Sequence, residues 1–273
     1  MLLSREPCAA LRPFVKTLWT VDQAASPWCG VTQWERVLPT GDMHIAIRLC
    51  DPPIRLLKHS GDSAGGPLGH AVIGGPRATF YTRDISQPIS TVGAQIHSIA
   101  ARGLFGMPAC EFADRHTRLD DVWGAWVDGL REQLIEATNL AQRLDILERV
   151  LVRRLRAVRR LHPAVAHGLQ ALHAGLKVRE VVEETGYSHR RFIALFREET
   201  GLAPKRFCRV LRFQKMLQEY SLNPAVSWSD LAHDCGYSDQ AHFNREFREF
   251  AGVTPEEYRS CSQHSAARIP LLR

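Results

Sequence analysis

The chain has 273 residues, of which 45% are hydrophobic and 23% charged, with 35 Lys and Arg against 29 Asp and Glu. This composition excludes a disordered or fibrous protein, and the length suits one large domain or two of ordinary size. The longest uncharged stretch, 85–101, is too polar to cross a bilayer, and Arg5 and Glu6 interrupt any signal peptide, so we expect a cytoplasmic protein.

Short apolar runs rich in β-branched residues fill the first hundred positions. Gly and Pro separate them, at 39–42 and 74–76 in particular, as in turns. Strands are therefore expected at 14–21, 33–38, 44–49, 71–73, 79–81 and 89–99. A glycine-rich loop is expected at 61–69.

From about residue 107 the pattern is helical. Apolar residues recur at three- and four-residue steps from Leu140 to Val158 and predict a long amphipathic helix that Pro163 ends. The apolar stripe has two interpretations of nearly equal weight. It packs within its own domain, or it forms the seam of a dimer.

The C-terminal hundred residues contain an internal repeat. Residues 183–188 (EETGYS) return at 233–238 (HDCGYS), and residues 196–204 (FREETGLAP) return at 247–255 (FREFAGVTP). In each copy a glycine can end one helix in the left-handed conformation, and Ser188 in the first copy, or Ser238 or Asp239 in the second, can cap the next helix. The repeat predicts two helix-turn-helix units, at about 176–198 and 226–249.

This tandem arrangement resembles the DNA-binding domain of the AraC/XylS family of bacterial transcription regulators over residues 163–260. Three segments before it, 34–41 (WERVLPTG), 74–77 (GGPR) and 105–108 (FGMP), resemble the β-rich effector domain of one subgroup of that family. The family more often has an acidic residue where Thr40 stands, and the resemblance does not carry over a ligand.

The predicted fold is therefore α+β in three parts. Residues 1–106 form a β-rich, barrel-like sensory domain, and residues 107–162 form a helical connector that could also hold a dimer together. Residues 163–260 form an all-α tandem helix-turn-helix domain, followed by a tail at 261–273.

The resemblance implies double-stranded DNA as a partner and two groups of DNA-contacting residues. In the first unit they are His189, Arg190, Arg191, Ile193, Ala194 and Arg197, and in the second Gln240, Ala241, His242, Asn244 and Arg245. Amide side chains such as Gln240 and Asn244 can pair with adenine, and Arg245 with guanine, whereas Ile193 and Ala194 can only meet a thymine methyl group. The second unit is thus expected to read sequence more than the first.

Charge supports that division of roles. Residues 189–215 carry a net charge of +6 and residues 216–260 a net charge of −5. Phosphate contacts dominate nonspecific affinity for DNA. The first unit and the helix that follows this unit should therefore supply most of that affinity. For Arg212 in that helix, a buried salt bridge and a phosphate contact are equally weighted alternatives.

The alternative function is an enzyme, or a thiol-based sensor or repair domain, tethered to DNA by the helix-turn-helix pair. It needs an activated nucleophile or a metal cluster. The scattered histidines His44, His59, His70 and His97 form no metal-binding motif, and no basic neighbour activates Cys29, Cys50 or Cys110. We therefore expect no enzymatic activity, cofactor or metal, and a regulator with a small-molecule effector, RNA polymerase and a second copy of the chain as further partners.

Overall fold

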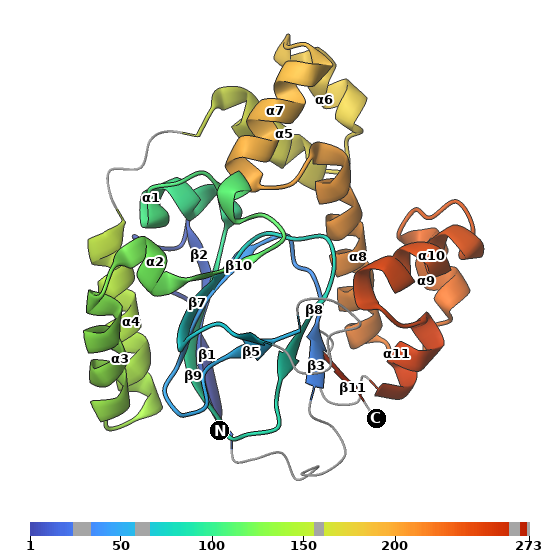
Figure 1. Ribbon diagram of the computed structural model, residues 1–273. Coiled ribbons are helices and arrows are strands. Elements are labelled where there is room, and N and C mark those ends of the chain that lie inside the picture. The colour runs from blue at the N-terminus through green and yellow to red at the C-terminus, as the bar shows by residue number, and fades with distance from the viewer. Residues whose placement is uncertain (24–33, 58–65, 156–160, 262–267, 272–273) are drawn as a thin grey trace.

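The N-terminal part of the protein is built on two antiparallel sheets that face each other (Figure 1). The computed structural model describes residues 1–23, 34–57, 66–155, 161–261 and 268–271. The first sheet has the order β1 (Leu2–Arg5), β2 (Val15–Gln23), β9 (Ile89–Ile96), β4 (Met43–Arg48), β7 (Ala71–Gly74) and β10 (His116–Arg118). The second has the order β11 (Arg268–Leu271), β3 (Trp34–Val37), β8 (Tyr81–Asp84), β5 (Arg55–Leu56) and β6 (Gly66–Pro67).

The first sheet is covered on its outer face by α3 (Trp126–Glu136) and α4 (Leu140–Arg154), with α1 (Ala101–Phe105) and α2 (Leu119–Trp123) nearby (Figure 1). Leu144, Leu147 and Leu151 of α4 are completely buried in the same core as the strands. The leucine stripe is therefore used for packing within the domain. The expected end of this helix at Pro163 is wrong, because α4 already ends at Arg154. Pro163 is instead the first residue of α5, where its missing N–H costs no hydrogen bond.

The remaining helices form a second core. They are α5 (Pro163–His173), α6 (Val178–Thr185), α7 (His189–Thr200), α8 (Pro204–Leu222), α9 (Trp228–Asp234), α10 (Gln240–Ala251) and α11 (Pro255–Cys261). Its largest fully buried side chains are Tyr258, Phe192, Phe196, Phe213, Phe243, Phe247 and Phe250. In Figure 1, α8 runs between α5–α7 at the top and α9–α11 at the right.

The expected α+β class is confirmed, and the two sheets stay open rather than closing into a barrel. The sequence did not predict β1, β5, β10 or β11, and β8 overlaps the expected segment 79–81 only at Tyr81 and continues to Asp84. Of the expected loop 61–69, residues 66–67 are instead strand β6, and 61–65 are outside the described residues. The presumed tail contains β11, whose Ile269 pairs with Arg36 of β3 and is 1% exposed.

Within the described ranges, no helix has both the length and the hydropathy needed to span a bilayer.

Candidate nucleic-acid interface

The first helix-turn-helix unit is formed by α6 and α7. Gly186 ends α6 at φ +70°, a conformation that costs glycine little because it has no Cβ. The side chain of Ser188 then accepts a hydrogen bond from the Arg191 N–H (3.3 Å), which caps α7.

The second unit, α9 and α10, repeats this geometry. Gly236 has φ +75°, and Asp239 accepts the His242 N–H at 2.7 Å. Asp239, rather than Ser238, is therefore the helix cap. Its ionised form accepts this bond, and backbone and Ser238 hydrogen bonds lower the pKa of the Asp239 carboxyl.

Both recognition helices bury one face and expose the other. Phe192 and Phe196 on α7 and Phe243 and Phe247 on α10 are all 0% exposed. The candidate DNA-contacting residues that are exposed are His189, Arg190, Arg191, Ile193, Ala194, Arg197, Gln240, Ala241, Asn244 and Arg245. His242 alone among the candidates is half-buried, because its Nδ1 lies 3.1 Å from the Ser238 hydroxyl and its ring packs edge-on against Tyr237.

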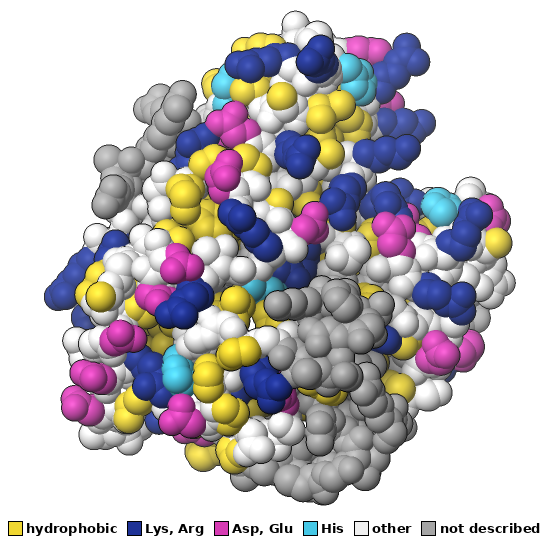
Figure 2. All heavy atoms as spheres, viewed as in Figure 1, with side chains coloured by type: hydrophobic (Ala, Val, Ile, Leu, Met, Phe, Trp, Pro, Cys, Tyr) yellow, Lys and Arg dark blue, Asp and Glu magenta, His cyan; other side chains and the backbone are white. Residues whose placement is uncertain are grey.

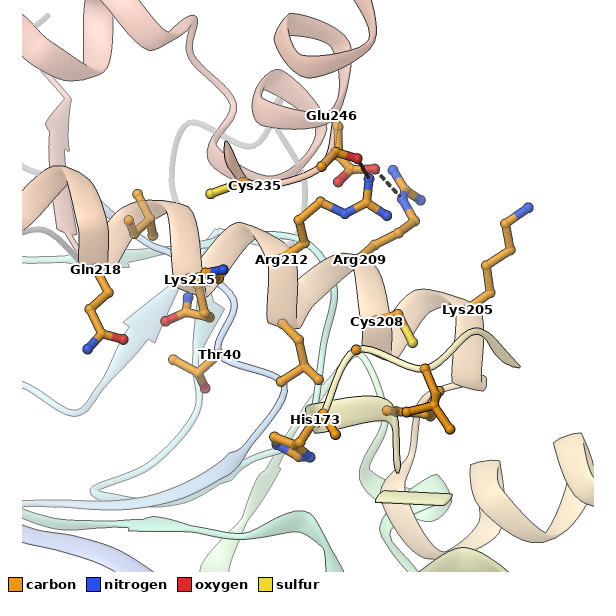
Figure 3. A pocket seen from close by; sticks show the side chains of 18 of the residues that line it. Thr40, His173, Lys205, Cys208, Arg209, Arg212, Lys215, Gln218, Cys235 and Glu246 are labelled. Carbon is orange, nitrogen blue, oxygen red and sulfur yellow. Dashed lines mark hydrogen bonds and ion pairs between the residues drawn. The ribbon is translucent and has the colours of Figure 1, made fainter. Parts of the chain in front are cut away.

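A cleft of about 1640 Å³ separates the two units, with α8 along it (Figure 3). Its cationic lining includes Lys177, Lys205, Arg212 and Lys215, and Lys16 of the sheet domain lies at its edge. Figure 2 shows Lys and Arg side chains running from the upper lobe into the notch beside the right-hand lobe. The stripe Lys205, Cys208, Arg212 and Lys215 follows helical spacing, the signal by which α8 could have been added to the predicted interface.

Two of the arginines that contribute to the net charge of +6 over residues 189–215 form salt bridges within the protein. Arg206 pairs with Asp114 of the sheet domain at 3.1 Å. Arg209 pairs with Glu246 at 2.7 Å and also with Glu249, both on α10 (Figure 3 shows the Glu246 pair). These pairs hold α8 to its neighbours, so the charge free to attract phosphates is smaller than the sequence count suggested.

Arg212 makes no salt bridge among the described residues, so the buried-pair alternative is wrong. Its guanidinium lies over the Tyr237 ring at 5.0 Å, and its Nη1 donates to the Gly236 carbonyl at 3.4 Å. The Tyr237 ring thus holds Arg212 toward the cleft. The phosphate contact stays a prediction.

The sheet domain touches equivalent points of the two units. Gly201 and Gly252 end α7 and α10 in the same left-handed conformation, at φ +76° and +71°. A Cβ on Gly201 would lie 2.3 Å from the Pro76 side chain, and one on Gly252 would lie 2.5 Å from the Phe80 ring. Arg36 Nη1 also donates to the Gly252 carbonyl at 3.0 Å. One segment of the sheet domain, 76–80, therefore contacts both units.

A separate polar cluster lies between the sheets, formed by His44, Arg77, Tyr81 and His116. His44 stacks on Tyr81 with ring centroids 5.8 Å apart, and Tyr81 meets His116 edge-on at 4.5 Å. Desolvation, with the nearby positive charges of Arg77 and Arg83, lowers the pKa of His44 to about 3. Desolvation and the same Arg77 lower the pKa of His116 well below its ordinary value. Both imidazoles are therefore neutral at pH 7.

This cluster makes stability depend on pH. The unfolded chain binds a proton on His44 near pH 6.5 and the folded chain only near pH 3, so stability is complete above pH 6.5 and falls as the pH drops toward about 3. Between pH 7 and pH 5, we expect His44 to lower the free energy of unfolding by about 2 kcal/mol. Urea unfolding at both pH values measures this, and His44→Gln should show a clearly smaller loss; an equal loss would contradict it.

The alternative enzyme or sensor function needs a metal cluster or an activated thiol. No group of three or more His, Cys, Asp or Glu side chains in the described ranges could hold a metal. Burial and the neighbouring Glu111 raise the pKa of Cys110, which favours the unreactive thiol. Cys29 and His59 lie outside the described residues.

Two protein families match separate parts of the chain. Residues 181–260 match a family described as a helix-turn-helix domain, and residues 4–118 match a domain of unknown function, DUF6597. The first match covers both recognition helices. The second covers the two sheets apart from β11 and the first two residues of β1.

Several curated regulators are similar over part of their length. The chain is 29% identical to the transcriptional activator RhaR of Pectobacterium carotovorum over 49% of this chain and 51% of that protein. It is 32% identical to the activator RhaS of Escherichia coli over 29% of this chain and 28% of that protein. It is 27% identical to the multiple antibiotic resistance protein MarA of Salmonella typhimurium over 37% of this chain and 78% of that protein. The chain thus spans no more than about half of RhaR and RhaS.

Among solved structures, ToxT of Vibrio cholerae aligns over 95% of this chain and 98% of its own with a TM-score of 0.48 and 8% identity. The C-terminal domain of the response regulator AraT of Geobacillus stearothermophilus aligns over 37% of this chain and 88% of its own, with a TM-score of 0.34 and 24% identity.

Proposed function

We propose that the chain is a sequence-specific DNA-binding transcription regulator of the AraC type, a proposal that the match of residues 181–260 to a helix-turn-helix domain and the similarity to RhaR and RhaS support. One observation carries the proposal: two repeated units expose the recognition faces of α7 and α10, and a cationic cleft along α8 lies between residues 172–178 of the first unit and α10 of the second. At about 1.5 Å per residue, the 19 residues of α8 span about 28 Å, which is comparable to one helical turn of DNA. The two recognition helices would enter successive major grooves.

The sheet domain is proposed to bind a small-molecule effector. Its segment 76–80 contacts both DNA-binding units, so a ligand that binds more tightly to one arrangement of these contacts would bias DNA binding. RNA polymerase and a second copy of the chain are the proposed protein partners, and the cytoplasm is the proposed location. In this proposal the chain has no catalytic activity of its own.

The test is binding of the full chain to duplexes selected from a random pool, compared with shuffled sequences over a range of salt concentrations. Selection of a defined motif is the expected result. Equal affinity for selected and shuffled DNA in the wild type would refute sequence-specific binding. Absence of a mobility shift at low salt would refute DNA binding altogether.

Variants separate the roles of the two units. Arg190→Ala or Arg191→Ala should weaken binding to all sequences and reduce the steepness of its salt dependence, because each removes a phosphate contact. Gln240→Ala or Arg245→Ala should instead reduce discrimination by about 1 to 3 kcal/mol at one base pair. Arg179→Ala is the matched control: this exposed arginine lies on α6, paired with Glu183, away from the recognition face. The same loss in Arg179→Ala and Arg191→Ala would contradict the assignment.

A further inference from the structure

We propose that the cleft along α8 binds the DNA backbone midway between the two recognition helices. The contacts come from four cations of its lining, called here the cleft cations: Lys177, Lys205, Arg212 and Lys215. The inference rests on the proposed function and deepens it, because it assigns a site on the protein to the stretch of duplex that neither recognition helix reads.

The cleft cations are not neutralised by the protein. Among the described residues, none of the four forms a salt bridge, whereas the other two cations of the lining do: Lys16 pairs with Asp42 at 2.8 Å and Arg209 with Glu246 at 2.7 Å. Within the described part of the chain, Glu246 is also the one carboxylate that lines the cleft. The cleft therefore has a surplus of positive charge, which attracts a polyanion.

The spread of the charges fits a nucleic-acid backbone better than a small anion. Lys205 and Lys215 lie about 15 Å apart along α8, at about 1.5 Å per residue. One strand of DNA carries a phosphate at about every 3.4 Å of the helix axis, so about four phosphates pass over this length. A single carboxylate or phosphate group could contact only one end of the row.

The walls of the cleft adjoin the DNA-reading parts of both units. One wall is residues 172–178, which lead into α6, and the first helix of a helix-turn-helix crosses the DNA backbone. The opposite wall includes His242 of α10. Arg245 follows three residues later, so this wall and the recognition face are neighbours on the helix surface. A duplex held by α7 and α10 would thus pass its backbone over the cleft, where Figure 2 shows Lys and Arg side chains in the notch between the lobes.

One of the cleft cations is held in place before DNA arrives. The Arg212 guanidinium lies over the Tyr237 ring at 5.0 Å, and its Nη1 donates to the Gly236 carbonyl at 3.4 Å. A guanidinium has five N–H donors, so others remain for a phosphate. Because the side chain is already ordered, less conformational entropy is lost when it binds.

The experiment measures the affinity of the full chain for its selected duplex over a range of salt concentrations. Lys205→Gln, Arg212→Gln and Lys215→Gln should each lower the slope of log K against log salt by about 1 and leave the selected motif unchanged. Arg206→Gln is the matched control. Arg206 lies on the same helix but outside the lining of the cleft, and it already pairs with Asp114 at 3.1 Å, so its slope should equal that of the wild type.

A change in the DNA tests the position of the contact. Uncharged methylphosphonates replace the phosphates midway between the two recognised segments of the duplex. This replacement should weaken binding by the wild type, and it should weaken binding by the triple variant Lys205→Gln/Arg212→Gln/Lys215→Gln much less, because the partner charges are already gone. A purely structural role of α8 would not produce this coupling.

The outcomes separate this site from the regulator proposal. Wild-type slopes in all three single variants, an equal fall in Arg206→Gln, or equal effects of methylphosphonates on the wild type and the triple variant would overturn the backbone site. Unchanged slopes would also assign the cleft to a ligand other than DNA. Motif-selective binding with any of these results leaves the regulator standing, whereas failure to bind any duplex overturns both.

Discussion

Replacing Arg209 with methionine is expected to destabilise the protein by about 3 to 5 kcal/mol, because it leaves a buried charge without its partner. Arg209 on α8 pairs at 2.7 Å with Glu246, whose side chain is 2% exposed on the inner face of α10. The same guanidinium reaches Glu249 and lies over the Phe250 ring at 5.0 Å. Urea unfolding of the full chain measures the loss.

Two comparisons test the cause of this destabilisation. Arg206→Met removes an arginine from the same helix, but its partner Asp114 is 44% exposed, so we expect a loss of about 0 to 1 kcal/mol. The double variant Arg209→Met/Glu246→Leu removes both charges and should recover most of the stability lost in Arg209→Met. If Arg206→Met and Arg209→Met lose the same stability, or the double variant recovers none, the buried charge is not the cause.

Gly201→Ala should cost about 2 to 5 kcal/mol, the sum of two penalties. A residue with a Cβ is strained by about 1 to 2 kcal/mol at the left-handed φ of +76°. The new Cβ would also lie 2.3 Å from the Pro76 side chain and 3.1 Å from the Ala109 carbonyl oxygen, and overpacking of this kind costs about 1 to 3 kcal/mol.

Gly186→Ala isolates the first penalty. Gly186 has nearly the same φ, +70°, but no other atom lies within 4 Å of a Cβ placed there. The difference between the two variants in thermal or urea unfolding is therefore the cost of disturbing the contact between the domains. Equal losses would mean that the added Cβ does not disturb this contact.

The parts of the fold that the sequence predicted are those determined locally. Gly186, Ser188 and the phenylalanine spacing specify a helix, its end and its buried face within a few residues, and the repeat shows the same pattern twice. Short strands have no such local signal. Strands β10 and β11 consist of three and four residues whose partners lie far away in sequence, so that pairing rather than propensity creates them.

The same distinction applies to the candidate interface. The exposed positions on α7 and α10 follow from helical periodicity, and all but His242 lie on the surface as their predicted roles require. The partners of Arg206 and Arg209 do not follow from it. They are 92 and 37 residues away, in Asp114 and Glu246, and a count of charges along the chain cannot show which cations are already paired.

The pairing of β11 with β3 determines how the DNA-binding helices can move. Residues 163–261 are anchored to the sheet domain at both of their ends, by the connection from α4 on one side and by the four-residue pairing of β11 on the other. The pairing is thus a second attachment of the DNA-binding helices to the sheet domain, added to the chain connection from α4. If the sheet domain regulates DNA binding as proposed, a change that kept β11 on β3 would reposition both recognition helices together while the domain remains attached at both ends.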